Sequence, residues 1–111
     1  MRQRIDLDAD SDFGIAMPTF GEIWFLGFNS SKRKKNIRTL RHTVRRFAFW
    51  DFDSRAAMEY GLIRTELLQR GKAISVIAMQ VAAIARKNGL IVVSADPDFS
   101  HVADLRTVSW M

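Results

Sequence analysis

Apolar and polar residues alternate along the chain in blocks that are short enough for single strands and helices. Gly14 to Met17 is a brief apolar run that predicts a strand. Pro18-Thr19 then opens a helix through Phe28, because proline suits the first turn of a helix. From Lys32 to Arg46, apolar side chains recur at helical spacing and predict a second helix. Phe47 to Trp50 predicts another short strand.

The second half of the chain continues this alternation. Asp53 is a predicted N-cap of a helix that ends at Gly71, and a further helix ends at Gly89. Leu90 to Val93 follows as an uninterrupted apolar strand, of the kind that is usually buried on both faces. A last strand is predicted at Arg106 to Ser109. Strands that alternate with helices favour an α/β fold with a mainly parallel sheet.

Composition narrows the class of protein. A length of 111 residues with 48% hydrophobic content suits one core, so we expect a single domain over residues 1–111. The chain has no cysteine, which excludes disulfides and thiolate metal sites and favours a cytoplasmic location. No apolar run approaches the roughly 20 residues that span a bilayer, and the N-terminus is polar and acidic, so no membrane partner is expected.

Positive charge is concentrated in one segment. The net charge is +5, yet residues 23–50 contain eight lysines and arginines and no carboxylate. Clustered cations of this kind neutralise phosphates, which points to a polyanion such as RNA. The alternative is the solvated face of an amphipathic helix, although such faces normally mix signs. The candidate RNA-binding residues are Lys32, Arg33, Lys34, Lys35, Arg38, Arg41 and Arg45.

Three acids are candidates for metal binding. Asp96 and Asp98 directly follow the strand that ends at Val93, and ligands in open parallel sheets sit beyond the carboxyl ends of strands. Glu22 also comes soon after a predicted strand. Carboxylates there could hold Mg²⁺ or Mn²⁺, which take oxygen ligands. The alternatives are an ordinary Asp-Pro-Asp turn and a solvated helix glutamate.

Two other features of the first third of the chain need an explanation. The series Asp6 to Asp12 favours a solvated acidic turn over a calcium loop, because Phe13 stands where the loop needs glycine. Trp24 to Phe28 makes the first helix apolar nearly all round, so this helix is either deeply buried or pressed against another subunit.

The sequence resembles a VapC-type PIN domain over almost its whole length. The resemblance implies a three-layer α/β fold in which four acids at one edge of the sheet bind Mg²⁺ or Mn²⁺ and hydrolyse RNA. It also implies a toxin that an antitoxin protein holds inactive, and a homodimer. The segments that carry it, in order, are Met17-Pro-Thr-Phe-Gly-Glu-Ile-Trp-Phe, Phe52-Asp, Tyr60-Gly-Leu-Ile-Arg-Thr-Glu-Leu, Gly71-Lys-Ala-Ile-Ser, Ala82-Ala-Ile-Ala, Val93-Ser-Ala-Asp-Pro-Asp-Phe and Leu105-Arg-Thr-Val-Ser-Trp.

Only part of that family's acidic centre has a counterpart here. Glu22 matches the second acid and Asp96 the fourth, both expected to be catalytic, and Asp98 resembles an auxiliary metal ligand. Ala78 stands at the third acid and cannot ligate a metal. The resemblance further implies that the first, central strand, which carries the first acid, is missing before Met1, so that the PIN-like domain is incomplete at its N-terminus.

These gaps leave three hypotheses. The first is a metal-dependent endoribonuclease of a toxin–antitoxin system whose activity is impaired, since few carboxylates hold a hard cation weakly. The second is a catalytically silent module that binds RNA or an antitoxin, which Ala78 favours. The third is a small basic nucleic-acid binder unrelated to the resemblance, against which the lack of a helix-turn-helix spacing counts.

Overall fold

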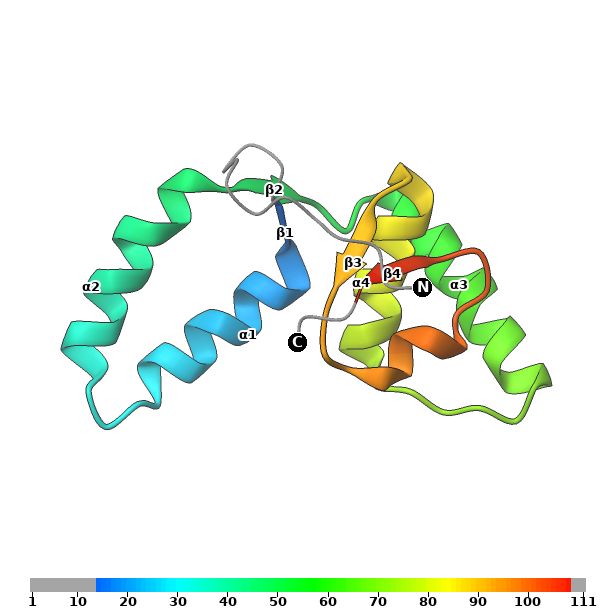
Figure 1. Cartoon of the computed structure of the whole chain (residues 1–111), viewed down its shortest axis with the longest axis horizontal. Helices are drawn as coiled ribbons and strands as arrows, with labels where there is room; N and C mark the ends of the chain where they lie inside the picture. The colour runs from blue at the N-terminus through cyan, green and yellow to red at the C-terminus, as the bar shows by residue number, and fades with distance from the viewer. Residues whose placement is uncertain (1–13, 109–111) are drawn as a thin grey trace. The chain divides into compact units, whose positions relative to one another are not determined.

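The computed structural model describes residues 14–108, which form two compact units, 14–50 and 51–108 (Figure 1). Each unit combines helices with a two-stranded parallel sheet, so the predicted α/β class is confirmed. The acidic series Asp6 to Asp12 and the predicted strand end at Ser109 lie outside the described residues. Among residues 14–108, none of the helices has the length and apolar character needed to cross a bilayer.

The unit of residues 14–50 is a helical hairpin flanked by two strands. Its elements are β1 (Gly14–Ala16), α1 (Met17–Phe28), α2 (Arg33–Thr43), the 3-10 turn η2 (Val44–Arg46) and β2 (Ala48–Trp50). The strands β1 and β2 pair in parallel. The single helix predicted from Lys32 to Arg46 therefore ends early, because its last turn tightens into η2 before the chain extends.

Close packing between α1 and α2 depends on Gly27. A Cβ at Gly27 would lie 2.8 Å from Cδ1 of Leu40 and 3.0 Å from Cδ1 of Ile37, so α2 approaches where a side chain is absent. Gly27 is nevertheless the only buried residue of α1. Phe25 is 59% and Leu26 66% exposed, so the first of the two alternatives for this helix, deep burial, is wrong. One face of α1 packs against α2, and the apolar side chains Phe25 and Leu26 on α1 remain exposed.

The unit of residues 51–108 is built on two longer helices. Its elements are α3 (Ser54–Gln69), α4 (Val76–Asn88), β3 (Ile91–Val93), the 3-10 helix η3 (Pro97–His101) and β4 (Arg106–Val108). The strands β3 and β4 pair in parallel, with Val92 opposite Thr107. The two helices pack against each other, and η3 packs on α4.

Local signals set the ends of these helices. The Asp53 side chain accepts a hydrogen bond from the backbone N–H of Ala56 at 2.9 Å, which confirms the predicted N-cap of α3. The Ser75 hydroxyl caps α4 in the same way, at 3.1 Å from the N–H of Ala78. Gly89 has a φ of 67°, the left-handed conformation in which glycine ends a helix, as predicted.

The core of this unit lies between α3, α4 and the short elements that follow. Ala82 and Ala83 are fully buried, and their small side chains let α3 approach α4. In β3 only Val92 is buried, whereas Ile91 and Val93 are half-buried, so the expectation of burial on both faces is wrong. Among residues 14–108, β3 pairs with one strand only, and such a strand is covered less than one inside a wide sheet. The buried core residues are Ile63, Leu67, Ala78, Met79, Ala82, Ala83, Ala85, Val92, Phe99 and Val102.

Candidate functional site

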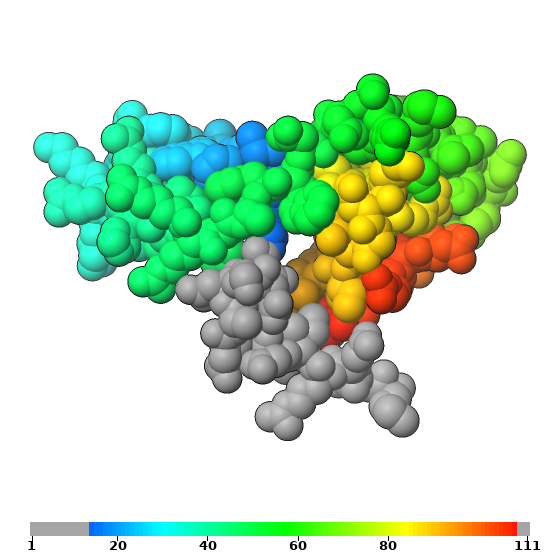
Figure 2. Space-filling view, turned by 90° about the horizontal axis from the view of Figure 1, so that it is seen from above, coloured from blue at the N-terminus to red at the C-terminus, as the bar shows by residue number. Residues whose placement is uncertain are grey.

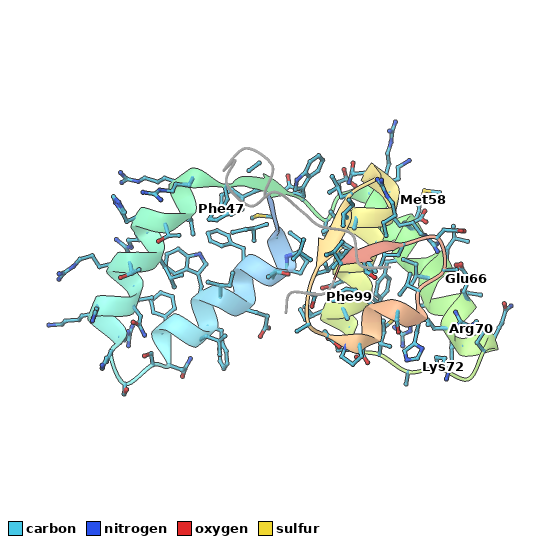
Figure 3. All side chains as sticks on the ribbon, viewed as in Figure 1. Phe47, Met58, Glu66, Arg70, Lys72 and Phe99 are labelled. Atoms are coloured by element: carbon cyan, nitrogen blue, oxygen red, sulfur yellow. The ribbon has the colours of Figure 1, made fainter. Side chains whose placement is uncertain are left out.

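The turn after β3 presents two carboxylates at the carboxyl end of a parallel strand. Asp96 accepts a hydrogen bond from the backbone N–H of Asp98 at 2.9 Å and so caps η3, in which Pro97 occupies the first turn. The Ser94 hydroxyl accepts from the N–H of Asp96 at 3.0 Å. Phe99, 7% exposed, anchors η3 in the core (Figure 3). The turn is therefore held by hydrogen bonds at Asp96 and by the buried side chain of Phe99 that follows it.

These two acids can offer a cation only part of a binding site. Asp96 is exposed and Asp98 half-buried, so both carboxylates reach solvent. Within residues 14–108, no three Asp, Glu, His or Cys side chains gather closely enough to form a metal site. A magnesium-like cation often takes one or two carboxylates and completes its shell with water and substrate phosphate. The pair fits a weakly held cation of this kind, and it does not form a full protein cage.

Ala78 lies in the hydrophobic core at the start of α4. Its side chain is 4% exposed, and its backbone N–H is bound by the Ser75 cap. An aspartate at this position would be a buried carboxylate, which is costly without a partner. The core packing explains how an alanine is accommodated at this position, where the family resemblance leads one to expect a third acid.

Glu22 belongs to the other unit. It lies on α1, one turn beyond Pro18, and is exposed. A hydrogen bond from the backbone N–H of Asp98 to the Asp96 carboxylate holds these two residues together. Glu22 belongs to the unit of residues 14–50, whereas Asp96 and Asp98 belong to the unit of residues 51–108. A shared site of the three acids stays a prediction.

Three of the basic side chains of α2 lie on one flank. Residues in a helix are rotated by about 100° from one to the next. Lys34, Arg38 and Arg41 therefore share one side, and the opposite side carries uncharged polar residues, Asn36, Thr39 and Thr43. All candidate RNA-binding residues are exposed.

Among residues 14–108, no carboxylate forms a salt bridge with this basic flank. In the described part of the chain the salt bridges are made by Arg86, which is far from α2 in sequence. Arg33, at the start of α2, lies over the ring of Phe28, with 5.1 Å from its Cζ to the ring centroid. This flank of α2 is therefore a cationic surface that runs along the helix, as expected for contact with the phosphates of a nucleic acid.

The residues that hold the segment of residues 101–103 against the helices were not predicted from the sequence. Arg86 on α4 binds Glu59 and Glu66 of α3 and donates to the carbonyl oxygen of Ala103 at 3.1 Å. Burial alone would lower the pKa of Arg86, but hydrogen bonds to Glu66 and Glu59 outweigh it and raise that pKa above its usual value. Its charge is therefore permanent.

A second arginine ties η3 to α3. The Arg70 guanidinium donates to the carbonyl oxygen of His101 at 2.6 Å. The bond from Arg86 to Ala103 joins residues 17 positions apart, and the bond from Arg70 to His101 joins residues 31 positions apart. Neither separation corresponds to a sequence pattern that predicts a contact. The spacing of residues within a single sequence gives no signal for such pairs.

Comparison with known proteins agrees with this architecture. A family model described as "PIN domain" matches residues 2–105. The "tRNA(fMet)-specific endonuclease VapC" of Shigella flexneri is 30% identical over 99% of this chain and 83% of that protein.

Two solved structures share the fold. VapBC2 of Rickettsia felis, bound to a promoter DNA fragment, has a TM-score of 0.83 at 24% identity, over 88% of this chain and 74% of that one. VapBC-5 of Mycobacterium tuberculosis, a member of the VapBC family of toxin–antitoxin systems, has a TM-score of 0.78 at 20% identity, over 87% and 81%. With the match to the family model, which covers most of the sequence, these findings show that the chain belongs to the PIN-domain family, in its VapC branch.

Proposed function

We propose that this chain is a divalent-metal-dependent ribonuclease of a toxin–antitoxin pair, working with a reduced acidic centre. The observation that carries the proposal is the rigid Asp96-Pro97-Asp98 turn, which presents two solvent-accessible carboxylates at the end of the parallel strand β3. Family membership supports the reaction, since the VapC of Shigella flexneri is named an endonuclease specific for tRNA(fMet).

Asp96 and Asp98 are the residues we assign to the metal, with Mg²⁺ or Mn²⁺ as the ion. Their oxygens suit a hard cation, and the Asp96 oxygen that caps η3 leaves the second oxygen of the same carboxylate for a ligand. When bound, the cation supplies positive charge that polarises a phosphodiester and helps to activate water. Glu22 is assigned to catalysis on its match to the family's second acid, and its exposure on α1 is compatible with that role.

The first test is cleavage of a mixed single-stranded RNA pool by the purified chain. We expect slow cleavage in Mn²⁺ that stops in EDTA, and a large loss in Glu22→Gln, which keeps the shape of an exposed side chain and removes its charge. Cleavage that continues in EDTA, or a fully active Glu22→Gln protein, would overturn the assignment.

RNA is the substrate class we assign to the cationic flank of α2. Replacing Arg38 and Arg41 by glutamine removes two adjacent exposed charges. Each phosphate contact contributes about 0.7 to the slope of log affinity against log salt for single strands, so we expect a slope shallower by about 1.4 and binding about 20-fold weaker at roughly 0.1 M salt. Filter binding or fluorescence anisotropy in EDTA, over a salt series, measures both quantities.

A charge-matched control separates this surface from net charge. Arg55 and Lys87 are exposed and belong to the unit of residues 51–108. Their double replacement by glutamine changes the net charge equally and should leave the salt slope nearly unchanged. Equal loss in both double variants would show that binding follows overall charge, and the assignment of α2 would be wrong.

Two protein partners complete the proposal. VapBC-5 of Mycobacterium tuberculosis belongs to a family of toxin–antitoxin systems, which supports an antitoxin as a partner of this chain. The second partner is another copy of the same chain, in the homodimer that the resemblance to VapC-type proteins implies.

A catalytically silent module that binds an antitoxin or RNA is the second candidate function. The observation that favours it is Ala78, which is buried where the resemblance places a third acid. A folded protein that binds RNA with the salt dependence given above, yet cleaves nothing in Mn²⁺ or Mg²⁺, would make this the better description.

A further inference from the structure

Aromatic rings and an arginine meet where α1 turns into α2. The guanidinium of Arg33 lies over the ring of Phe28, with 5.1 Å from its Cζ to the ring centroid. The ring of Trp24 stacks against Phe28, with 6.0 Å between centroids and 30° between the ring planes. We call these three residues the hairpin-turn site. The turn, in cyan, lies on the surface at the end of the hairpin opposite β1 and β2 (Figure 1, Figure 2).

Hydrogen bonds fix the turn that carries the hairpin-turn site. The Ser30 hydroxyl accepts from the backbone N–H of Lys32 at 3.1 Å and from the side-chain amide of Asn36 at 2.6 Å. One side chain of the turn is therefore bound both to the turn itself and to the first turns of α2. Phe28 and Arg33 are thus arranged before a ligand arrives, which lowers the entropy lost on binding.

The hairpin-turn site is open to solvent and surrounded by positive charge. Phe28 is 44% exposed and Arg33 is exposed, so a planar ligand can reach both side chains. Lys32, Lys34 and Lys35 flank Arg33 in sequence and are exposed as well. Nucleobases stack on aromatic rings and on guanidinium groups, and neighbouring cations neutralise the phosphates. The combination therefore suits a nucleic-acid strand whose bases are accessible.

Two other anionic occupants fit the hairpin-turn site less well. A duplex keeps the faces of its bases inside its own stack, so it would use the lysines and leave the Phe28 ring unused. An acidic peptide would also pair with the lysines. The face of an aromatic ring is electron-rich, however, so it attracts cations and other rings rather than carboxylates.

We propose that Phe28 and Arg33 bind an unpaired base of an RNA strand whose phosphates lie along the cationic flank of α2. The base stacks on the exposed part of the Phe28 ring and on the Arg33 guanidinium, and Trp24 supports the ring from within the hairpin. This rests on the RNA binding proposed above and adds a contact to a base. It makes unpaired segments of RNA the preferred ligand, ahead of duplexes of the same length.

The test compares a single-stranded RNA with an abasic RNA of the same length, by fluorescence anisotropy in EDTA over a salt series. Arg33→Lys keeps the charge and removes the planar guanidinium. We expect it to weaken binding of the intact RNA about 5-fold at an unchanged salt slope, and to leave binding of the abasic RNA unchanged. Phe28→Leu should act in the same way, because it removes the ring and keeps an apolar side chain.

Matched variants separate stacking from charge and from folding. Arg46→Lys changes an exposed arginine of η2, and Phe25→Leu changes a ring on α1 that is 59% exposed, so both should bind intact RNA like the unmodified chain. Circular dichroism of each variant checks the fold. Equal weakening of intact and abasic RNA by Arg33→Lys, or no weakening of either, would overturn the stacked base and leave the phosphate contacts of α2 standing.

Two further outcomes identify other errors. Polyglutamate that binds as tightly as the intact RNA, and loses as much affinity in Arg33→Lys, would make an acidic peptide the occupant and overturn the proposal. An unmodified chain that binds neither RNA would overturn both the stacked base and the assignment of RNA to α2.

Discussion

Asp96→Asn is expected to slow metal-dependent RNA cleavage by at least about 100-fold, since changes in the outer shell of a metal site alone cost 10- to 100-fold. The substitution removes one of the two carboxylates that the turn after β3 offers a cation. Asparagine caps helices as well as aspartate does, so the hydrogen bond to the N–H of Asp98 and the start of η3 should persist. Single-turnover cleavage in Mn²⁺, with circular dichroism of the same sample, measures the effect.

Asp104→Asn provides the control for this loss. Asp104 is exposed in the same unit and has a φ of 58°, a conformation that asparagine tolerates well. The control therefore changes the net charge by the same amount at no backbone cost and should cleave like the unmodified chain. Equal rates for Asp96→Asn and the unmodified chain would remove Asp96 from the metal site.

Arg86→Ala is expected to lower the free energy of unfolding by about 2 kcal/mol, because the partly exposed carboxylates of Glu59 and Glu66 lose their charged hydrogen-bond donor. The Arg86 side chain is 11% exposed and Glu59 21% exposed, so solvent can replace little of the lost contact. The carbonyl oxygen of Ala103 also loses its donor, which releases the segment before β4. Urea denaturation followed by circular dichroism gives the difference.

Arg64→Ala is the matched control for the effect of Arg86. Arg64 lies on α3, is exposed, and within residues 14–108 donates one side-chain hydrogen bond, to Tyr60. Exposed contacts of this kind contribute at most about 1 kcal/mol. If Arg86→Ala lowered the free energy of unfolding no more than Arg64→Ala does, the contacts of Arg86 would not stabilise the packing of α3, α4 and the loop before β4.

The ends of elements were predictable because their causes are local. Asp53 caps α3 through a bond to Ala56, three residues on, and Gly89 ends α4 because glycine alone accepts its φ of 67° without strain. The Asp96-Pro97-Asp98 turn was equally readable, since its defining hydrogen bond spans two residues. Its position after a parallel strand then followed from the apolar run before it.

Burial and long-range pairing were decided only by tertiary structure. The apolar run from Trp24 to Phe28 shows which side chains of α1 could be buried. In α1 only Gly27 is buried, because α2 covers one face of this helix. The same holds for Leu68, an apolar residue of α3 that is 71% exposed. Helical spacing shows on which side of the helix each side chain lies. Which side is buried depends on the element that packs against the helix.

By itself the sequence determined the α/β class, the family, the acids at the end of β3 and the cationic flank of α2, because periodicity, caps and motif order are written within a few residues of one another. The structure added the clamp of Arg86 on Glu59 and Glu66 and the burial of Ala78. Those contacts join residues about 20 positions or more apart, and their energy depends on desolvation that exists only once α3 and α4 have packed.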